Sequence, residues 1–538
     1  RLLCIDEVHN IRNADDVGNK RTANQLMFLI KSTTRMKLLL LSGTPMFNNY
    51  KEIVWLINLM NMNDGRGLIK VSDVFNANGE FQESDEEEET ESGRDVLARK
   101  TAGYVSFVRG ENPYTFPYRV YPDLFSPDNT FSVIPLQKNS IVGGEVVQNK
   151  VNTITKSNIY VTRLGEYQEG VYNNMIQDLV SDMASGRTHT KKSGDDEDDG
   201  DEEGSGTKGT VRIGYTRLQD PLQCLNMTFP LNDMTGLDAD DTTVDANKVE
   251  NVLARHAAVA KDAIGTRGLK STMDYVDERT ESNYMKGQFA YKTWIQQSKE
   301  HKNFLAPDNV GRYSGKLKQV CDSILESVGV VLVYSQYLDG GLIPIALALE
   351  EMGIARYGTK DKSLFKTPPA AKPFLVGANP PRQAKYIMIT GDKRISPGNA
   401  AEIAAATKDE NVYGDHVKVV LVSMAGSEGV DLKFIRQVHI VEPWYNMSRI
   451  DQIVGRAVRH NSHKLLPFRE RNVQIFMYGS AVRDETQETA DIYVYRNAEA
   501  KAVQIGVVTR ALKEFSVDCF LNHSQTNFSA DKMNQSVE

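Results

Sequence analysis

Short apolar runs that end in charged or small residues recur along this chain. Residues 2–5 are followed directly by two acids, and residues 36–41 are followed by Ser-Gly-Thr-Pro. Apolar residues at helical spacing come between or after such runs, as at residues 50–62. Buried parallel strands form continuous apolar runs because helices cover both faces of their sheet. The pattern therefore predicts an α/β fold built on parallel sheets.

The same alternation returns in the last part of the chain. Helices are expected at residues 341–352 and 490–515, and strands at residues 328–334, 386–390, 417–423, 438–441 and 473–478. The region from residue 104 to 310 is harder to assign, although a strand is expected at 158–162 and an amphipathic helix at 166–183. Two α/β parts separated by a mixed region are therefore predicted.

Acidic residues are concentrated in two tracts. Residues 83–91 contain seven acids and residues 195–203 contain eight. We expect both tracts to be disordered insertions, because they have no apolar surface to bury; contact with a basic partner is the alternative. The net charge of the 538-residue chain is −8, and it becomes +7 when these fifteen acids are left out. The acidic average therefore does not exclude a nucleic-acid partner.

The four cysteines lie far apart and show no CxxC or Cys/His spacing. This arrangement predicts reduced thiols in a cytosolic or nuclear protein, without a zinc site. No apolar run approaches the roughly 20 residues that span a bilayer, and no secretory signal is visible. The chain begins at Arg1 inside an apolar run, so we expect it to be a fragment of a longer protein.

Asp6, Glu7 and His9 follow the first apolar run directly. Ligands of open parallel sheets bind at the carboxyl ends of the strands. At such a position an Asp can hold Mg²⁺, usually through water, and a Glu can orient or deprotonate an attacking water. An ordinary strand end would have a similar composition, so this interpretation depends on the motifs that accompany it.

Two further motifs place small residues after predicted strands. The hydroxyls of Ser42 and Thr44, in Ser42-Gly43-Thr44-Pro45, could relay the state of a bound nucleotide, although a simple turn has the same composition. Residues 423–432 contain glycines that let a backbone approach a phosphate, a sugar or a nucleic-acid strand. The candidate binding residues of this segment are Gly426, Glu428, Gly429 and Asp431.

Gln452, Arg456 and Arg459 are spaced at i, i+4 and i+7, which predicts that they line one face of a helix. A second face with the same spacing suits burial and carries Ile450, Val454 and Ala457. Two arginines on one face suit a γ-phosphate in the manner of arginine fingers, with Gln452 contacting the phosphate or its water. A solvated basic face is the alternative.

No GxxxxGK[ST] phosphate-binding loop occurs anywhere in the sequence. Residues 311–317 resemble one only superficially. They have one residue too few between their glycines, and Leu317 stands where a Ser or Thr would hold Mg²⁺. We therefore expect this chain by itself to bind ATP poorly and to hydrolyse little of it.

In their sequence order these motifs resemble those of the DEAD/H-type superfamily 2 helicase-like ATPases, and most closely the Swi/Snf-like branch. The matching segments are residues 6–9 (Walker B motif), 42–45 (motif III), 423–432 (motif V), 452–459 (motif VI), and also 41–52, 314–317, 331–335 and 389–392. In this family the phosphate-binding loop precedes the Walker B motif. Its absence here is therefore best explained by truncation.

The resemblance implies two RecA-like domains, the first incomplete, that bind ATP and Mg²⁺ between them in the intact protein. Asp6 would hold the metal and Glu7 the attacking water. The implied catalytic residues are Asp6, Glu7, Gln452, Arg456 and Arg459, and the implied nucleotide-binding residues are His9, Ser42, Thr44, Gly426, Glu428, Gly429 and Asp431.

On this resemblance the chain has four parts. Residues 1–125 are expected to be the C-terminal part of the first RecA-like domain, and residues 126–310 a linker or insertion region. Residues 311–485 are expected to form the second RecA-like domain, and residues 486–538 a C-terminal helix and tail.

Residues 103–119, 221–227 and 516–522 resemble segments of helicases of large nucleocytoplasmic DNA viruses, of the type related to the poxvirus early transcription factor small subunit. This resemblance implies a DNA-dependent ATPase that contacts the DNA phosphate backbone in viral early transcription. Viral RNA polymerase or a second transcription factor subunit would be its partner, and no membrane is implied. The implied location is the virion and the viral factory in the host cytoplasm, or the nucleus for a cellular protein, and not outside the cell.

Three other functions stay open. The chain could be a viral nucleoside triphosphatase that releases transcripts, or a cellular Swi/Snf-like remodeller, and the motifs do not separate these from a DNA translocase. The third alternative is a non-catalytic DNA-binding assembly subunit. The presence of the acids and arginines together argues against this last function.

Overall fold

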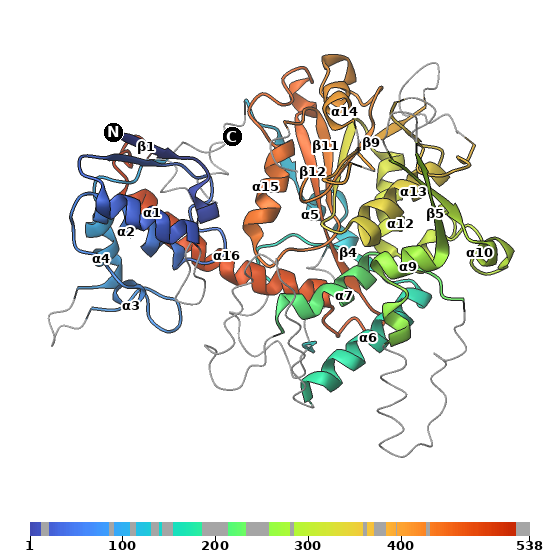
Figure 1. The fold of residues 1–538 in the computed structure, drawn as a ribbon, viewed down its shortest axis with the longest axis horizontal. Helices are drawn as coiled ribbons and strands as arrows, with labels where there is room; N and C mark the ends of the chain where they lie inside the picture. The colour runs from blue at the N-terminus through green and yellow to red at the C-terminus, as the bar shows by residue number, and fades with distance from the viewer. Residues whose placement is uncertain are drawn as a thin grey trace.

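The computed structural model describes residues 1–11, 21–84, 91–107, 114–130, 139–141, 154–184, 213–232, 258–279, 285–358, 363–370, 383–393, 395–396, 398–426 and 431–522. These residues form a smaller lobe that contains the N-terminus and a larger lobe built on an extended sheet (Figure 1). Most of the first acidic tract, all of the second, Glu428, Gly429 and the tail after Asn522 lie outside the described residues, and the predictions made for them stay predictions.

In its described part the first lobe has a two-stranded parallel sheet. β1 (Leu2–Ile5) pairs with β2 (Lys37–Leu40), with Leu2 opposite Lys37 and Ile5 opposite Leu40. The other elements are η1 (Val8–Ile11), α1 (Arg21–Ser32), α2 (Glu52–Asn63), α3 (Val71–Val74) and α4 (Gly93–Thr101). α2 contacts α1, β2 and α4, and its buried apolar residues form the centre of the lobe. The strands and the helix predicted for this part are confirmed.

The second lobe is organised on an eight-stranded parallel sheet. Seven strands lie in the order β3-β12-β11-β7-β10-β9-β8, and β4 pairs with the C-terminal part of β12. The strands are β3 (Tyr118–Val120), β4 (Tyr160–Arg163), β7 (Val330–Tyr334), β8 (Ala355–Arg356), β9 (Lys385–Ile389), β10 (Val419–Val422), β11 (Ile435–Ile440) and β12 (Asn472–Ala481). Every residue of β7 and β10 is buried, which explains their uninterrupted apolar sequences.

The second lobe also contains helices from the middle region and from the C-terminal part. They are α5 (Pro122–Phe125), η2 (Pro127–Asn129), α6 (Glu166–Ala184), α7 (Tyr215–Asn226), α9 (Gly265–Thr272), α10 (Thr293–Gln297), α11 (Val310–Tyr313), α12 (Gly315–Glu326), η5 (Leu338–Leu342), α13 (Ile343–Glu351), α14 (Asn399–Ala406), η7 (Asp409–Asn411), α15 (Met447–Ala457) and η8 (Phe468–Glu470). β5 (Met273–Arg279) and β6 (Met285–Tyr291) form a separate antiparallel pair. None of the described helices is long and apolar enough to cross a membrane.

The middle region is part of the core of the second lobe. Val171 of α6 and Leu222 of α7 are fully buried, and they belong to the same apolar cluster as Val331 of β7. The region that was predicted as a linker or insertion therefore contributes to the packing of the second lobe.

The boundary predicted at residue 125 does not match the sheet. β3, which was assigned to the first domain, pairs with β12 of the second lobe, with Tyr118 opposite Asn472. β4, from the predicted linker, also pairs with β12, with Tyr160 opposite Tyr478. Strands of three or four residues have too few side chains to show a clear pattern, so their partner could not be predicted.

α16 (Ala490–Phe515) joins the two lobes and has the bounds that were predicted for it. Ile492 and Tyr495, in its N-terminal part, are buried in the core of the second lobe. Val508 and Leu512, in its C-terminal part, are buried in the core of the first. Figure 1 shows this helix running from the large lobe to α2 and α4 of the small one. Two lobes with parallel sheets and a long C-terminal helix confirm the predicted α/β fold class.

Candidate active site

Two acidic residues lie at the carboxyl end of β1. Asp6 and Glu7 are both exposed, and the backbone N–H of Glu7 donates to Asp6 Oδ1 at 3.0 Å. Glu7 has a φ of +50°, a left-handed conformation that costs a non-glycine residue roughly 1–2 kcal/mol. The turn therefore stores some strain while it leaves both carboxylates accessible from solvent.

The turn after β1 is bonded to the turn after β2. His9 Nδ1 lies 2.8 Å from Ser42 Oγ, and the same hydroxyl accepts a hydrogen bond from the N–H of Thr44 at 3.0 Å. The His9 ring is 4% exposed and stacks on Phe47, with ring centroids 5.4 Å apart. Glu7 Oε2 lies 3.3 Å from His9 Nδ1. The structure thus brings the predicted residues of both strand ends into one bonded unit.

Helix α15 carries the second set of predicted residues. Its buried face contains the predicted Ile450, Val454 and Ala457, and also Ile453. Gln452 and Arg456 lie on its partly exposed side. The helix ends at Ala457, because Val458 leaves the helical conformation, with a ψ of 85°, and buries its side chain. Arg459 therefore lies in the following turn, and the prediction of one helical face for all three polar residues was wrong for Arg459.

Arg459 connects this turn to the segment after β10. Its Nη1 lies 2.9 Å from Asp431 Oδ1, and its Nε donates to the carbonyl oxygen of Gly455 at 3.2 Å. Two residues that were predicted to contact a nucleotide therefore contact each other. An ion pair with both side chains partly exposed is weak, so each partner can exchange the other for a ligand at little cost.

The turn after β10 packs on the neighbouring strand β9. Ser423 Oγ accepts a hydrogen bond from the N–H of Gly426 at 3.2 Å. A Cβ atom on Gly426 would lie 2.0 Å from the carbonyl oxygen of Ile389 in β9, so this internal contact already requires a glycine. Its predicted role in ligand binding gains no support from these surroundings. Glu428 and Gly429 lie outside the described residues.

The two lobes meet at the N-terminus of α15. Ser448 Oγ donates to the carbonyl oxygen of Phe47 at 2.9 Å, a contact that no sequence pattern indicated. In the described part of the chain, neither acid at the end of β1 forms a hydrogen bond or ion pair with Arg456 or Arg459. The structure therefore places the two predicted sets in adjoining lobes without joining them.

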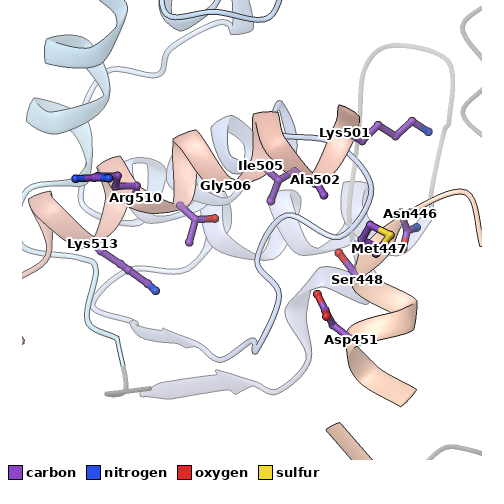
Figure 2. Close-up of a pocket in the computed structure, with 11 residues that line it drawn as sticks. Asn446, Met447, Ser448, Asp451, Lys501, Ala502, Ile505, Gly506, Arg510 and Lys513 are labelled. Carbon is purple, nitrogen blue, oxygen red and sulfur yellow. The ribbon is translucent and has the colours of Figure 1, made fainter. Parts of the chain in front are cut away.

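A cavity of about 400 Å³ lies close to this junction, between α15 and α16. Figure 2 shows Asp451 of α15 and Lys513 of α16 extending into the space between the two helices. Ser448 and Arg510 also line the cavity, but none of the predicted catalytic or nucleotide-binding residues does. Its position therefore does not correspond to the predicted nucleotide site.

The lysine of segment 311–317, which superficially resembles a phosphate-binding loop, is fully buried. Lys316 is 0% exposed, and its Nζ lies 2.9 Å from Asp491 Oδ2 and donates to the carbonyl oxygen of Val441 at 2.9 Å. Burial would raise the pKa of Asp491, but Lys316 and hydrogen bonds from Thr489 and Ser480 hold it below its ordinary value. Lys316 is thus unavailable to a nucleotide, in agreement with the sequence interpretation.

A second buried carboxylate, Glu442, follows β11. It accepts hydrogen bonds from Asn226 Nδ2 at 2.7 Å, from Ser335 Oγ at 2.9 Å and from the N–H of Gln336 at 2.5 Å. Burial raises its pKa to about 7, although these bonds and Lys316 act in the opposite direction. Glu442 therefore connects α7 with the residues that follow β7 through hydrogen bonds. The only sequence signal for it was an acid that directly follows an apolar run.

The residues at the end of β1 fit a magnesium ion that accompanies a nucleotide. Asp6 and Glu7 are neighbouring exposed carboxylates, and Mg²⁺ prefers such oxygens together with water and phosphate oxygens. Among the described residues, no group of three or more His, Cys, Asp or Glu side chains is arranged to hold a metal.

Part of the chain matches a known protein domain, and longer stretches are similar to viral proteins. The helicase conserved C-terminal domain matches residues 381–461, a range that includes Gln452, Arg456 and Arg459. A termination factor NPH-I homolog of African swine fever virus is 28% identical over 235 residues, which are 39% of this chain and 33% of that protein. Protein R563 of Acanthamoeba polyphaga mimivirus, which carries the name of an ATP-dependent RNA helicase, is 28% identical over 533 residues, 97% of this chain and 67% of that protein.

Two other similarities cover less or are weaker. Protein R350 of the same mimivirus, named in the same way, is 39% identical over 136 residues, 24% of this chain and 16% of that protein. The C-terminal part of the Fun30 ATPase domain, a solved structure, matches with a TM-score of 0.31 and 12% identity over 65% of this chain and 96% of that one, which is too low to support an argument. The chain thus spans 16% of R350 and 33% of the NPH-I homolog.

The range that matches the helicase C-terminal domain contains β9, β10, β11 and α15 of the larger parallel-sheet lobe. Over longer stretches the chain is similar to viral proteins that carry the names of helicases and of NPH-I termination factor homologs.

Proposed function

We propose that the protein is a nucleic-acid-dependent ATPase that moves along DNA during viral early transcription. The observation that carries this proposal is the bond between the two strand ends of the first lobe, where His9 Nδ1 and Ser42 Oγ are 2.8 Å apart. Through this bond, a conformational change beside the acids at the end of β1 is transmitted to Ser42 and Thr44 in the turn after β2. A motor requires such a connection between its nucleotide and its neighbouring surfaces.

In this proposal the residues of the first lobe act on water. Glu7 orients the attacking water and accepts its proton, and Asp6 would hold Mg²⁺. Bound Mg²⁺ supplies charge neutralisation at the phosphates. The exposure of both carboxylates supports these roles, because water and substrate can reach them.

The residues of the second lobe act on the phosphate. Arg456 and Arg459 stabilise the charge that develops on the γ-phosphate, and Gln452 positions the phosphate or its water. Arg459 first has to release Asp431, with which it is ion-paired at 2.9 Å. Hydrolysis then requires that the lobes approach each other, because the acids and the arginines lie in different lobes.

The test is an ATPase assay with single-stranded DNA, duplex DNA, single-stranded RNA and no nucleic acid. It compares this chain with any longer form that carries a GxxxxGK[ST] loop. We expect slow turnover by this chain and DNA-stimulated turnover by the longer form. Fast hydrolysis by this chain alone would contradict the need for the loop. Equal rates with and without every nucleic acid would contradict a motor.

A second candidate function is transcript release by a viral nucleoside triphosphatase. It is favoured by the similarity to the NPH-I termination factor homolog over 39% of this chain. In either role we propose the viral RNA polymerase or a second transcription factor subunit as the partner, and the virion and host cytoplasm as the location. ATP-dependent release of RNA from stalled polymerase complexes would favour the second candidate, and ATP-dependent movement on bare DNA the first.

A further inference from the structure

An exposed surface at the edge of the large sheet combines aromatic and basic side chains. It consists of residues 114–118 and of the loop 460–471, which precedes β12, and it is termed the aromatic–basic surface below. Tyr114, Tyr118 and Phe468 are 72%, 65% and 61% exposed. No predicted nucleotide-site residue belongs to it.

Arg471 holds the loop in one conformation. Its Nε donates to the carbonyl oxygen of Leu466 at 3.0 Å, its Nη2 to that of Lys464 at 2.9 Å, and its Nη1 to that of Tyr114 at 3.4 Å. Its guanidinium also lies 5.9 Å from the centroid of the Phe468 ring. Because each of its three nitrogens bonds to a backbone carbonyl within the protein, Arg471 acts as a positioning residue that fixes Phe468 beside Tyr114.

The two segments of the surface are also joined through their backbones. The N–H of Asn461 donates to the carbonyl oxygen of Thr115 at 2.7 Å, and the N–H of Tyr118 donates to that of Arg471 at 2.8 Å. The rings of Tyr114 and Phe468 have centroids 6.0 Å apart and planes tilted by 31°. Two exposed rings that are held together in this way form a preformed platform for stacking.

The loop is positively charged although the whole chain is acidic. Residues 460–471 contain three Lys or Arg residues and one acid, Glu470, whereas the chain has a net charge of −8. The Arg469 side chain is 87% exposed, and its Nε lies 3.9 Å from Glu470 Oε1, a long and weak ion pair. Lys464 is exposed, and its ammonium has no ion pair or hydrogen bond within the described residues. Two accessible cations therefore lie in the same loop as Phe468.

We propose that the aromatic–basic surface binds single-stranded nucleic acid. Bases stack on Tyr114 and Phe468, and phosphates contact Lys464 and Arg469. Exposed aromatic rings beside basic side chains are the usual means of binding unpaired bases, whose faces a duplex keeps covered. The surface lies outside the ATP site, so this binding needs no nucleotide and does not depend on the function proposed above.

The test is equilibrium binding of fluorescent oligo(dT) and oligo(U) strands of about 15 nucleotides, and of a duplex of the same length, in the absence of nucleotide. We expect F468A to weaken binding of the single strands by about fivefold or more without changing its salt dependence. We expect R469A to weaken binding and to lower the slope of log K against log salt by about 0.7. F468Y should restore most of the affinity, because it keeps the ring.

Matched controls come from elsewhere on the surface. Phe520 is 89% exposed and Lys299 is exposed, and neither belongs to the aromatic–basic surface. F520A and K299A should therefore bind the single strands as the unchanged protein does. Wild-type affinity in both F468A and R469A would overturn the proposal. The proposal would also be overturned if the duplex bound as tightly as the single strands and lost the same affinity in F468A and R469A. This binding is measured without nucleotide, so it does not depend on the outcome of the ATPase assay. Each of the two proposals can therefore be refuted without the other.

Discussion

Individual charged residues of the second lobe have roles that depend on their burial. Lys316 follows a Ser-Gly pair that could begin a phosphate site in another protein, but here its ammonium is enclosed by Asp491 and the Val441 carbonyl. The sequence alone predicted that this segment does not hold Mg²⁺, because Leu317 stands where a Ser or Thr would be required. The partner, Asp491, lies in the distant helix α16, and no local pattern in the sequence could identify it.

Replacement of Lys316 should strongly destabilise the second lobe. In K316M the carboxylate of Asp491 stays buried without its counter-charge, so we expect a loss of about 3–5 kcal/mol in the free energy of unfolding, measured by urea titration. The control is K318M in the same helix, where the pair with Asp322 is partly exposed and should contribute about 1 kcal/mol or less. The double variant K316M/D491L should recover much of the loss, and equal costs for K316M and K318M would contradict the argument.

Glu7 is the residue on which the proposed chemistry depends most directly. In a form of the protein that hydrolyses ATP, E7Q should reduce turnover by about 10²–10⁴-fold and leave ATP binding almost unchanged, because the amide keeps the shape but cannot accept the proton. The measurements are steady-state ATPase rates and equilibrium nucleotide binding. E410Q, at an exposed acid of η7 in the second lobe, is the control. Normal turnover in E7Q would remove Glu7 from the mechanism.

At the level of elements, sequence predicted best those strands that are buried on both faces. β7 and β10 form continuous apolar runs and were found at the expected positions. β11 begins at Ile435, three residues before the predicted start at residue 438. The prediction began too late because Arg436 and Gln437 interrupt the apolar pattern. Their side chains are hydrogen-bonded to Asn472 and Gln474 of β12, so polar residues are satisfied inside a strand. Such tertiary compensation cannot be read from one sequence.

The polar connection between β7, β11 and α7 should make stability depend on pH through Glu442. Burial raises its folded-state pKa to about 7 from an ordinary value of 4.5. The folded protein therefore holds this proton more tightly, and the stabilisation that it gives is complete below pH 4.5 and is lost as the pH rises towards 7. Relative to E442Q, the unchanged protein should lose up to roughly 1.4 kcal/mol per pH unit in this window.

The measurement is the difference in unfolding free energy between the two proteins from pH 4.5 to 8. Only this difference is informative, because burial also lowers the pKa of His439 to about 3 and that of His463 to about 4. These histidines cause a loss of stability as the pH falls, but both proteins contain them, so their effect cancels. Parallel stability curves for the two proteins would show that Glu442 does not titrate in this range.

At the level of the whole molecule, the candidate site was predicted in its parts but not in its assembly. Sequence placed Asp6 and Ser42 at two strand ends, and parallel pairing of β1 with β2 is sufficient to bring those ends together. The bond between Phe47 and Ser448 and the attachment of α16 to both cores arise from packing between lobes. Neither has a periodic signal, because each depends on surfaces that are far apart in the chain.

α16 should determine the local stability of the first lobe, because its C-terminal part completes that lobe's core. Leu512 is 5% exposed among side chains of α2 and α4, so L512A should cost about 2–5 kcal/mol there. We expect amide hydrogen exchange in β2 and α2 to accelerate by about thirtyfold or more, while exchange in β7 and β10 stays unchanged. V503A, at a half-exposed position of the same helix, should leave both lobes unaffected. Equal acceleration in both lobes would instead mean that they unfold as one cooperative unit, with α16 transmitting the loss across the whole molecule.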